Sequence, residues 1–186
     1  MFDLEQFIAD CRTALAEETS QRAVRELVAR AVSDPAAVIK ALGEPKRAGL
    51  TALYRASDLT IIDFHWGPSM TLMPHEHRMW GVIGVYTGRE DNIFWRRIET
   101  GEGGTRVEAT GARAICTGHV EPLGRDIVHS VTNPLPRITG ALQVYGGDFF
   151  GVARSEWDPE TLRERPYDLD RARRVFEESN QRWGLA

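Results

Sequence analysis

Apolar residues recur at helical spacing over the first 43 residues of the chain. They form two stripes, Leu4, Ile8, Cys11 and Leu15 in the first and Val24, Leu27, Val28 and Val32 in the second. Their period is that of amphipathic α-helices. Asp34 followed by Pro35 is a favourable helix start, and Gly43 is a favourable stop. The pattern predicts helices near residues 2–17, 20–32 and 35–42.

The pattern changes between about residue 50 and residue 150, where short segments rich in Val, Ile, Thr and aromatic residues are separated by Gly and Pro. These segments include residues 59–66, 79–88, 92–100, 105–110, 112–118 and 137–147. Strands at this spacing are typical of a β-sandwich or a β-barrel. The connections are too short for the crossover helices of a parallel sheet. We therefore expect a mainly β fold.

A helical pattern returns near the C-terminus, after an Asp-rich start. Its apolar residues are Leu169, Ala172, Val175 and Phe176. Together the patterns predict an N-terminal helical segment at 1–45 that packs on the barrel, a barrel at 46–155 that carries the functional site, and a C-terminal helical extension at 156–186.

Composition excludes several classes of function. The chain has 186 residues, of which 42% are apolar and 27% are charged, as in an ordinary globular domain. A net charge of −4 does not suit a phosphate backbone, so we expect no nucleic-acid partner. No apolar run is long enough for a membrane span, and the acidic N-terminal stretch does not resemble a signal peptide. Two cysteines are too few for a disulfide framework, so we expect the reducing cytoplasm.

Two of the five histidines lie in the stretch MPHEHRMWG. His75 and His77 are two residues apart, so on a strand both imidazoles lie on the same face, about 7 Å apart, where they can share a metal ion. Glu76 then points to the opposite face. The spacing alone fits a surface charge cluster as well as it fits a metal site.

A third histidine favours the metal site. His129 lies at the end of an apolar segment 52 residues after His77, which is enough chain for an antiparallel barrel to return beside the pair. His65 and His119 are weaker candidates. No acidic residue follows His77 until Glu90, beyond a predicted turn. We therefore expect a neutral three-histidine site, which leaves the full charge of a divalent ion and favours an anionic ligand such as a thiolate or an enediolate.

The metal-site segments resemble those of a known superfamily. The strand pattern, with HxH and a later single histidine, is similar to the cupin double-stranded β-helix, which is a jelly-roll barrel. More narrowly, PHEHRMWGVIGVYTGRE with the following NIFWRR, and DIVHSVTNPLPRITGALQVYGGDFF, resemble the two metal segments of bacterial cysteine dioxygenase-type proteins. The resemblance covers about residues 50–150, and it implies that His75, His77 and His129 are iron ligands.

The resemblance also implies roles around the metal. Tyr145 matches a tyrosine whose hydroxyl faces the iron, although a tyrosine that only packs in the barrel wall fits the sequence too. The Ser and His that usually precede this tyrosine are replaced by Ala141 and Gln143, and Gln cannot shuttle a proton as His can. The family holds the substrate carboxylate with an arginine on an early strand, for which Arg55 and then Arg47 are the candidates.

The activity that the resemblance implies is that of a mononuclear non-haem Fe(II) dioxygenase. Such an enzyme oxidises a small thiol, for example cysteine or 3-mercaptopropionate, with O2 to a sulfinate. Two alternatives stay open: a cupin enzyme that uses Ni, Mn or Zn on a non-thiol substrate, and a non-catalytic cupin that binds a metal ion or a small ligand. We expect a monomer or a homodimer whose partners are the small thiol and O2, without a membrane.

Overall fold

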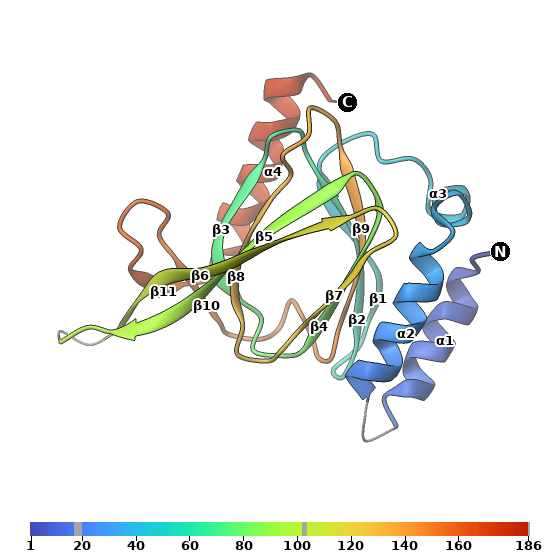
Figure 1. The fold of residues 1–186 in the computed structure, drawn as a ribbon, viewed down its shortest axis with the longest axis horizontal. Helices are drawn as coiled ribbons and strands as arrows, with labels where there is room; N and C mark the ends of the chain where they lie inside the picture. Colours follow the sequence, from blue (N-terminus) through green and yellow to red (C-terminus); the bar gives the residue numbers. More distant parts are fainter. Residues whose placement is uncertain (17–19, 102–103, 186) are drawn as a thin grey trace.

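The structure is a computed structural model that describes residues 1–16, 20–101 and 104–185. Two antiparallel sheets face each other, with three helices on one side of the barrel and a fourth on another side (Figure 1). The described helices are α1 (Leu4–Ala14), α2 (Ser20–Val32), α3 (Pro35–Leu42) and α4 (Leu169–Trp183). The described strands are β1 (Gly49–Arg55), β2 (Thr60–Trp66), β3 (Thr71–Glu76), β4 (Gly81–Thr87), β5 (Arg89–Glu99), β6 (Thr105–Cys116), β7 (Val120–Leu123), β8 (Val128–Thr132), β9 (Thr139–Tyr145), β10 (Ser155–Trp157) and β11 (Glu164–Pro166).

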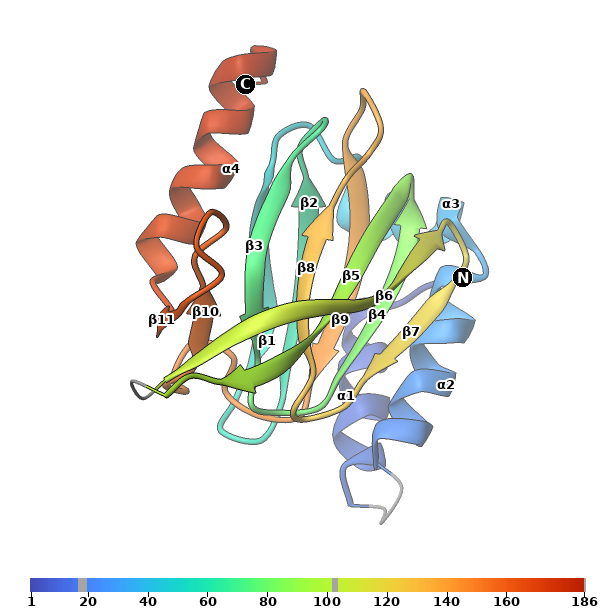
Figure 2. The same ribbon diagram turned by 60° about the vertical axis from the view of Figure 1, so that its left-hand side comes forward.

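Consecutive strands alternate between the two sheets. The five-stranded sheet has the order β1-β2-β9-β4-β7, and the six-stranded sheet has the order β11-β10-β3-β8-β5-β6. From β2 to β10 the chain crosses to the other sheet at every step except the β5–β6 hairpin. The chain therefore winds around one interior as a double-stranded β-helix (Figure 2). This confirms the predicted fold class, a mainly β jelly-roll barrel with helices near both ends.

Helices α1, α2 and α3 pack on the outer face of the five-stranded sheet. The buried helix residues in this layer include Phe7, Cys11, Val24, Val28, Val32 and Val38. The sheet contributes Ile61, Val82, Tyr86, Leu142 and Val144 to the same cluster. Because both faces of this sheet are covered, the residues of its central strands are almost all buried.

The structure confirms the predicted helices at 20–32 and 35–42. The first helix is shorter at its start than predicted. It begins at Leu4 because the Asp3 side chain accepts a hydrogen bond from Gln6 N at 2.9 Å and caps the helix. It ends at Ala14 with Leu15 as its C-cap, so it also ends earlier than predicted; the predicted end, residue 17, lies outside the described residues. None of the helices in the described ranges has the length and apolar character needed to cross a membrane.

Helix α4 packs against the barrel near β1 and β3 (Figure 1). Phe176 stacks on Trp66 of the barrel interior, with ring centroids 5.4 Å apart. The Asn180 side-chain amide accepts from Ala48 N at 2.7 Å and donates to Ala48 O at 3.0 Å. Asp168 caps the start of the helix. These contacts make α4 a wall of the interior.

Two features of the β part differ from the sequence expectations. The predicted segments 105–110 and 112–118 belong to one strand, β6, which pairs with β5 through a bulge between Phe94 and Trp95. The C-terminal extension begins with strand structure, because β10 pairs with β3 at Glu156 and His75 and so widens the six-stranded sheet. The division of the chain after 45 and 155 stays a prediction, and residue 186 lies outside the described residues.

The close packing of α2 on β4 depends on Gly84. A Cβ atom at this position would lie 2.4 Å from Cγ1 of Val28 and 2.9 Å from Cγ1 of Val32, and β-branched side chains have little rotational freedom. We expect Gly84→Ala to lower the free energy of unfolding in urea by about 1–3 kcal/mol. Gly111→Ala is the matched control, because a Cβ atom there meets nothing within 4 Å. An equal loss in both variants would contradict the packing argument.

Candidate metal centre

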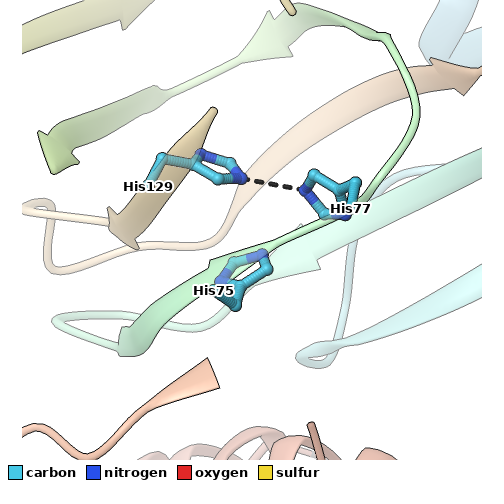
Figure 3. A group of neighbouring side chains, drawn as sticks. All are labelled: His75, His77 and His129. Carbon is cyan, nitrogen blue, oxygen red and sulfur yellow. Dashed lines mark hydrogen bonds between the residues drawn. The ribbon is translucent and has the colours of Figure 1, made fainter. Parts of the chain in front are cut away.

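Three histidines from neighbouring strands of the six-stranded sheet meet inside the barrel (Figure 3). His75 lies on β3, His77 directly follows that strand, and His129 lies on β8. His75 and His129 are paired across the two strands. Each side chain is 1–4% exposed, and one ligand atom from each lies within 4.8 Å of the others. The structure therefore brings the three predicted ligands together.

Glu76 points away from the three histidines, as strand alternation predicts. Its carboxylate accepts hydrogen bonds from Arg78 Nε at 2.6 Å, from Arg97, and from Ser155 N at 3.1 Å. Arg78 has a positive φ of 56°, which turns the chain after His77. Glu76 therefore supports the loop that carries His77.

Hydrogen bonds determine which ring nitrogens face the centre of the group. His75 Nδ1 donates to Met73 O at 2.9 Å, and His129 Nδ1 donates to Asn92 Oδ1 at 2.6 Å. In both rings the lone pair is therefore on Nε2. His77 Nε2 lies 2.9 Å from His129 Nε2. His77 Nδ1 is buried and has no hydrogen-bond partner among the described residues.

Burial keeps the three imidazoles neutral. It lowers the pKa of His75 to about 4, although the hydrogen bond to Met73 O opposes the shift. It also lowers the pKa of His77 and His129 well below the ordinary value, and repulsion from neighbouring histidines adds to the effect. Neutral imidazole is the form that binds metal ions, so the histidines are in the binding form at neutral pH.

The arrangement fits one transition-metal ion. Two imidazole nitrogens that bind one ion at about 2.1 Å and at right angles lie about 3.0 Å apart. This agrees with the 2.9 Å between the Nε2 atoms of His77 and His129. Within the described residues no carboxylate joins the group. Three imidazoles suit Fe, Cu, Ni or Zn and leave coordination positions open for other ligands.

Tyr145 and Gln143 on β9 line the same cavity as the histidines. The ring centroids of Tyr145 and His77 are 4.7 Å apart. The Tyr145 hydroxyl donates to Gln143 Oε1 at 2.5 Å, and Gln143 Nε2 donates to Glu90 Oε2 at 3.1 Å. Burial raises the pKa of Tyr145 well above its ordinary value, so the phenol stays protonated.

Sequence reasoning placed Glu90 beyond a turn and left it out of the ligand set, and among the described residues it is not part of the three-histidine group. The same reasoning missed that β5 begins at Arg89 and directs Glu90 into the barrel, where it is fully buried. Its carboxylate also accepts from Trp66 Nε1 at 2.7 Å and from Asn92 Nδ2 at 3.0 Å. The signal was the alternation of Glu90 and Asn92 with the more exposed Arg89 and Asp91.

The other predicted candidates lie away from the histidine group. Arg55 pairs with Asp148 at 2.8 Å and Arg47 pairs with Glu177 at 3.0 Å. Both arginine side chains are about half exposed, and neither lines the cavity beside the histidines. The two weaker histidines also lie apart: His65 Nε2 is 3.0 Å from an Asp63 oxygen, and His119 is exposed before β7.

Arg154, which sequence reasoning missed, is the arginine whose charge acts on the histidines. Its guanidinium carbon lies 4.3 Å from the ring centroid of Phe149 and 4.2 Å from that of Tyr167. It is 7% exposed. Nη1 donates to Phe149 O, but Nε and Nη2 have no hydrogen-bond partner among the described residues. Repulsion from this cation contributes to the lowered pKa of His75 and His77. Arg154 lies after the matched segments, in the connection between β9 and β10.

A narrow cavity opens beside the three histidines. It leaves about 30 Å³ for the centres of water-sized molecules, which is room for about two waters. Its lining is largely apolar and includes Phe64, Trp66, Leu72, Val131, Phe149 and Phe176. The site therefore suits a small ligand.

Fold and site together give a double-stranded β-helix barrel with a candidate three-histidine metal centre. No protein-family model matches the sequence. Among solved structures, the chain is similar to an RmlC-like cupin family protein from Methanocaldococcus jannaschii, with 10% identity and a TM-score of 0.45, over 56% of this chain and 84% of that one. It is similar to a cupin superfamily protein from Desulfitobacterium hafniense, with 11% identity and a TM-score of 0.44, over 56% and 82% of the two chains.

A variant of oxalate decarboxylase from Bacillus subtilis is similar at 13% identity and a TM-score of 0.37, over 50% of this chain. The chain spans only 22% of the length of that decarboxylase, and 53% of an oxalate oxidase that it also matches.

Metal content tests the three-histidine group. We expect about one transition-metal ion per chain in purified wild-type protein, and loss of that ion in His129→Ala because a ligand is removed. Elemental analysis of both proteins is the measurement. His119→Ala is the matched control, since His119 is exposed and outside the group. Equal metal content in wild type and His129→Ala would contradict the assignment.

The pH dependence of stability tests the burial of Glu90, which raises its pKa from 4.5 to about 7. Below pH 4.5 the carboxyl is protonated in both states. As the pH rises above 4.5, Glu90 ionises in the unfolded chain before it ionises in the folded protein. The folded protein therefore loses stability progressively between pH 4.5 and about pH 7, and the loss levels off above that pH. We expect metal-free wild type to lose about 3 kcal/mol relative to Glu90→Gln between pH 4.5 and pH 8. Urea unfolding measures this, and parallel pH curves for the two proteins would contradict it.

Proposed function

We propose that this protein is a mononuclear non-haem Fe(II) dioxygenase that oxidises a small thiol bearing a carboxylate to a sulfinate. The observation that carries the proposal is the buried group of three neutral histidines, which no carboxylate of the residues that the structure describes joins. In the reaction the thiolate sulfur gains both oxygen atoms of O2. RS⁻ and O2 therefore give RSO2⁻ without an added reductant.

The charge of the site supports a thiolate ligand. Three neutral imidazoles leave the charge of a divalent ion uncompensated, and the apolar walls of the cavity strengthen attraction between that charge and an anion. Fe(II) bound by the three histidines would supply a binding position for the thiolate and the activation of O2. The positive centre also lowers the pKa of a thiol that binds there.

The side chains around the histidines position the substrate and exclude water. Tyr145 lines the cavity and is held by its hydrogen bond to Gln143. Because the hydroxyl proton is directed to Gln143, the oxygen is free to accept a hydrogen bond from the substrate. Phe149 and Tyr167 line the cavity, and both rings lie against the guanidinium group of Arg154.

We assign the substrate carboxylate to Arg154, which does not line the cavity itself but contacts Phe149 and Tyr167, two of the residues that do. Its unpartnered Nε and Nη2 atoms form one edge of the guanidinium fork, which binds a carboxylate with two parallel hydrogen bonds. A buried cation with unsatisfied donors is unfavourable, so an anionic ligand stabilises this arrangement. The assignment replaces Arg55 and Arg47, whose guanidinium groups already pair with carboxylates.

A second candidate function is a cupin enzyme that uses Ni, Mn or Zn on a non-thiol substrate. Gln143 is the observation that favours it, because an amide holds the Tyr145 hydroxyl without being able to relay a proton. Non-catalytic binding of a small ligand is the remaining alternative. Metal content and activity after loading with each metal distinguish these cases.

Oxygen consumption tests the proposed function directly. Protein loaded anaerobically with Fe(II) is offered cysteine, 3-mercaptopropionate, cysteamine and mercaptosuccinate in turn. We expect O2 uptake with a carboxylate-bearing thiol, together with an equimolar amount of sulfinate. Iron-loaded protein that consumes no O2 with any of the four would count against thiol chemistry and in favour of the second candidate.

Arg154→Lys tests the carboxylate assignment. The substitution keeps the positive charge but removes the planar fork, so we expect KM for 3-mercaptopropionate to rise about tenfold or more. Cysteamine is the internal control, because it has no carboxylate and its KM should not change. Steady-state O2 uptake gives both values. A similar rise for the two thiols would point to a general loss of structure and remove the assignment.

A further inference from the structure

One buried carboxylate connects the polar groups on both sides of the metal centre. Glu90 has no exposed surface. Its Oε2 accepts hydrogen bonds from Trp66 Nε1 and Gln143 Nε2, and its Oε1 accepts one from Asn92 Nδ2. Asn92 in turn contacts His129. A single residue, Asn92, therefore links Glu90 to the candidate metal ligand His129 through hydrogen bonds.

The direction of these hydrogen bonds follows from the carboxylate. At a pH above its raised pKa of about 7, the Glu90 carboxylate is ionised and only accepts hydrogen bonds, so Asn92 must turn its NH2 group toward Glu90 and its oxygen toward His129. That oxygen lies 2.6 Å from His129 Nδ1, which therefore has to donate. The proton of the neutral ring is then on Nδ1, and the lone pair is on Nε2, which faces His77 Nε2 at 2.9 Å.

We propose that Glu90 is a positioning residue of the metal centre, which acts through Asn92 to hold His129 in the tautomer with a lone pair on Nε2. The groups that face Glu90 from other strands are neutral donors, Trp66 on β2 and Gln143 on β9. The inference concerns the site of the proposed function. The tautomer of His129, however, is a property of the metal-free protein and can be measured without activity.

Glu90→Gln tests the link because Trp66 determines how the introduced amide lies. The indole N–H only donates, so the introduced carbonyl oxygen faces Trp66 and the introduced NH2 group faces Asn92. The NH2 groups of the introduced glutamine and of Asn92 then face each other, and two donors cannot form a hydrogen bond. Asn92 therefore turns over and presents its own NH2 group to His129 Nδ1, and the ring proton moves to Nε2, where it blocks a metal ion.

A second substitution provides a matched rescue. In the double variant Glu90→Gln with Asn92→Asp, the introduced aspartate accepts from the introduced glutamine and from His129 Nδ1. The double variant has the same net charge as the wild type. It therefore restores the polarity of the chain of hydrogen bonds without restoring the carboxylate at position 90.

The primary measurement is the tautomer of His129 in metal-free protein at about pH 9, where the Glu90 carboxylate is ionised, from the NMR spectrum of ¹⁵N-labelled imidazoles. We expect the proton on Nδ1 in the wild type and the double variant, and on Nε2 in Glu90→Gln. The second measurement is Zn(II) affinity by competition with a chromophoric chelator. We expect a fall of about ten- to hundredfold in Glu90→Gln and recovery in the double variant.

A wild-type His129 that carries its proton on Nε2 would overturn the inference, and so would a Glu90→Gln protein that keeps the proton on Nδ1. Should Glu90→Gln fail to fold, the wild type and the double variant decide the matter, because Nε2 protonation in either one contradicts the assignment. If none of the proteins binds Zn(II), the metal centre of the proposed function fails. The tautomers still decide the role of Glu90.

Discussion

Several polar side chains are buried inside the barrel, and burial makes each of them depend on other protein groups for hydrogen bonds. This constraint connects His129, Asn92, Glu90, Gln143 and Tyr145 into one continuous chain of donors and acceptors. It also keeps the histidines neutral, because burial disfavours their charged form. The chemistry available at the site follows from this shared environment more than from any single residue.

The two sheets contribute differently to the site. The six-stranded sheet provides the histidines, and the five-stranded sheet provides Gln143 and Tyr145 opposite them. Helices α1, α2 and α3 cover the outer face of the five-stranded sheet, so that sheet is packed on both sides.

The parts of the molecule that sequence reasoning predicted are those whose geometry is local. His75 and His77 share a face because strand side chains alternate, and the helix at 35–42 has clear start and stop residues, Asp34 and Gly43. Glu90 and Arg154 were missed for another reason. Glu90 depends on the position where β5 begins, and Arg154 depends on two rings, Phe149 and Tyr167, which only the folded chain places on either side of it.

Helix α4 has a consequence for how this scaffold can diversify. Leu169, Ala172 and Phe176 line the cavity, yet the helix takes no part in the pairing of either sheet. Replacing these side chains changes the size and shape of the cavity and leaves the inter-strand hydrogen bonds intact. Substrate selectivity can therefore evolve, or be engineered, on one peripheral helix while the three histidines and their supporting residues stay unchanged.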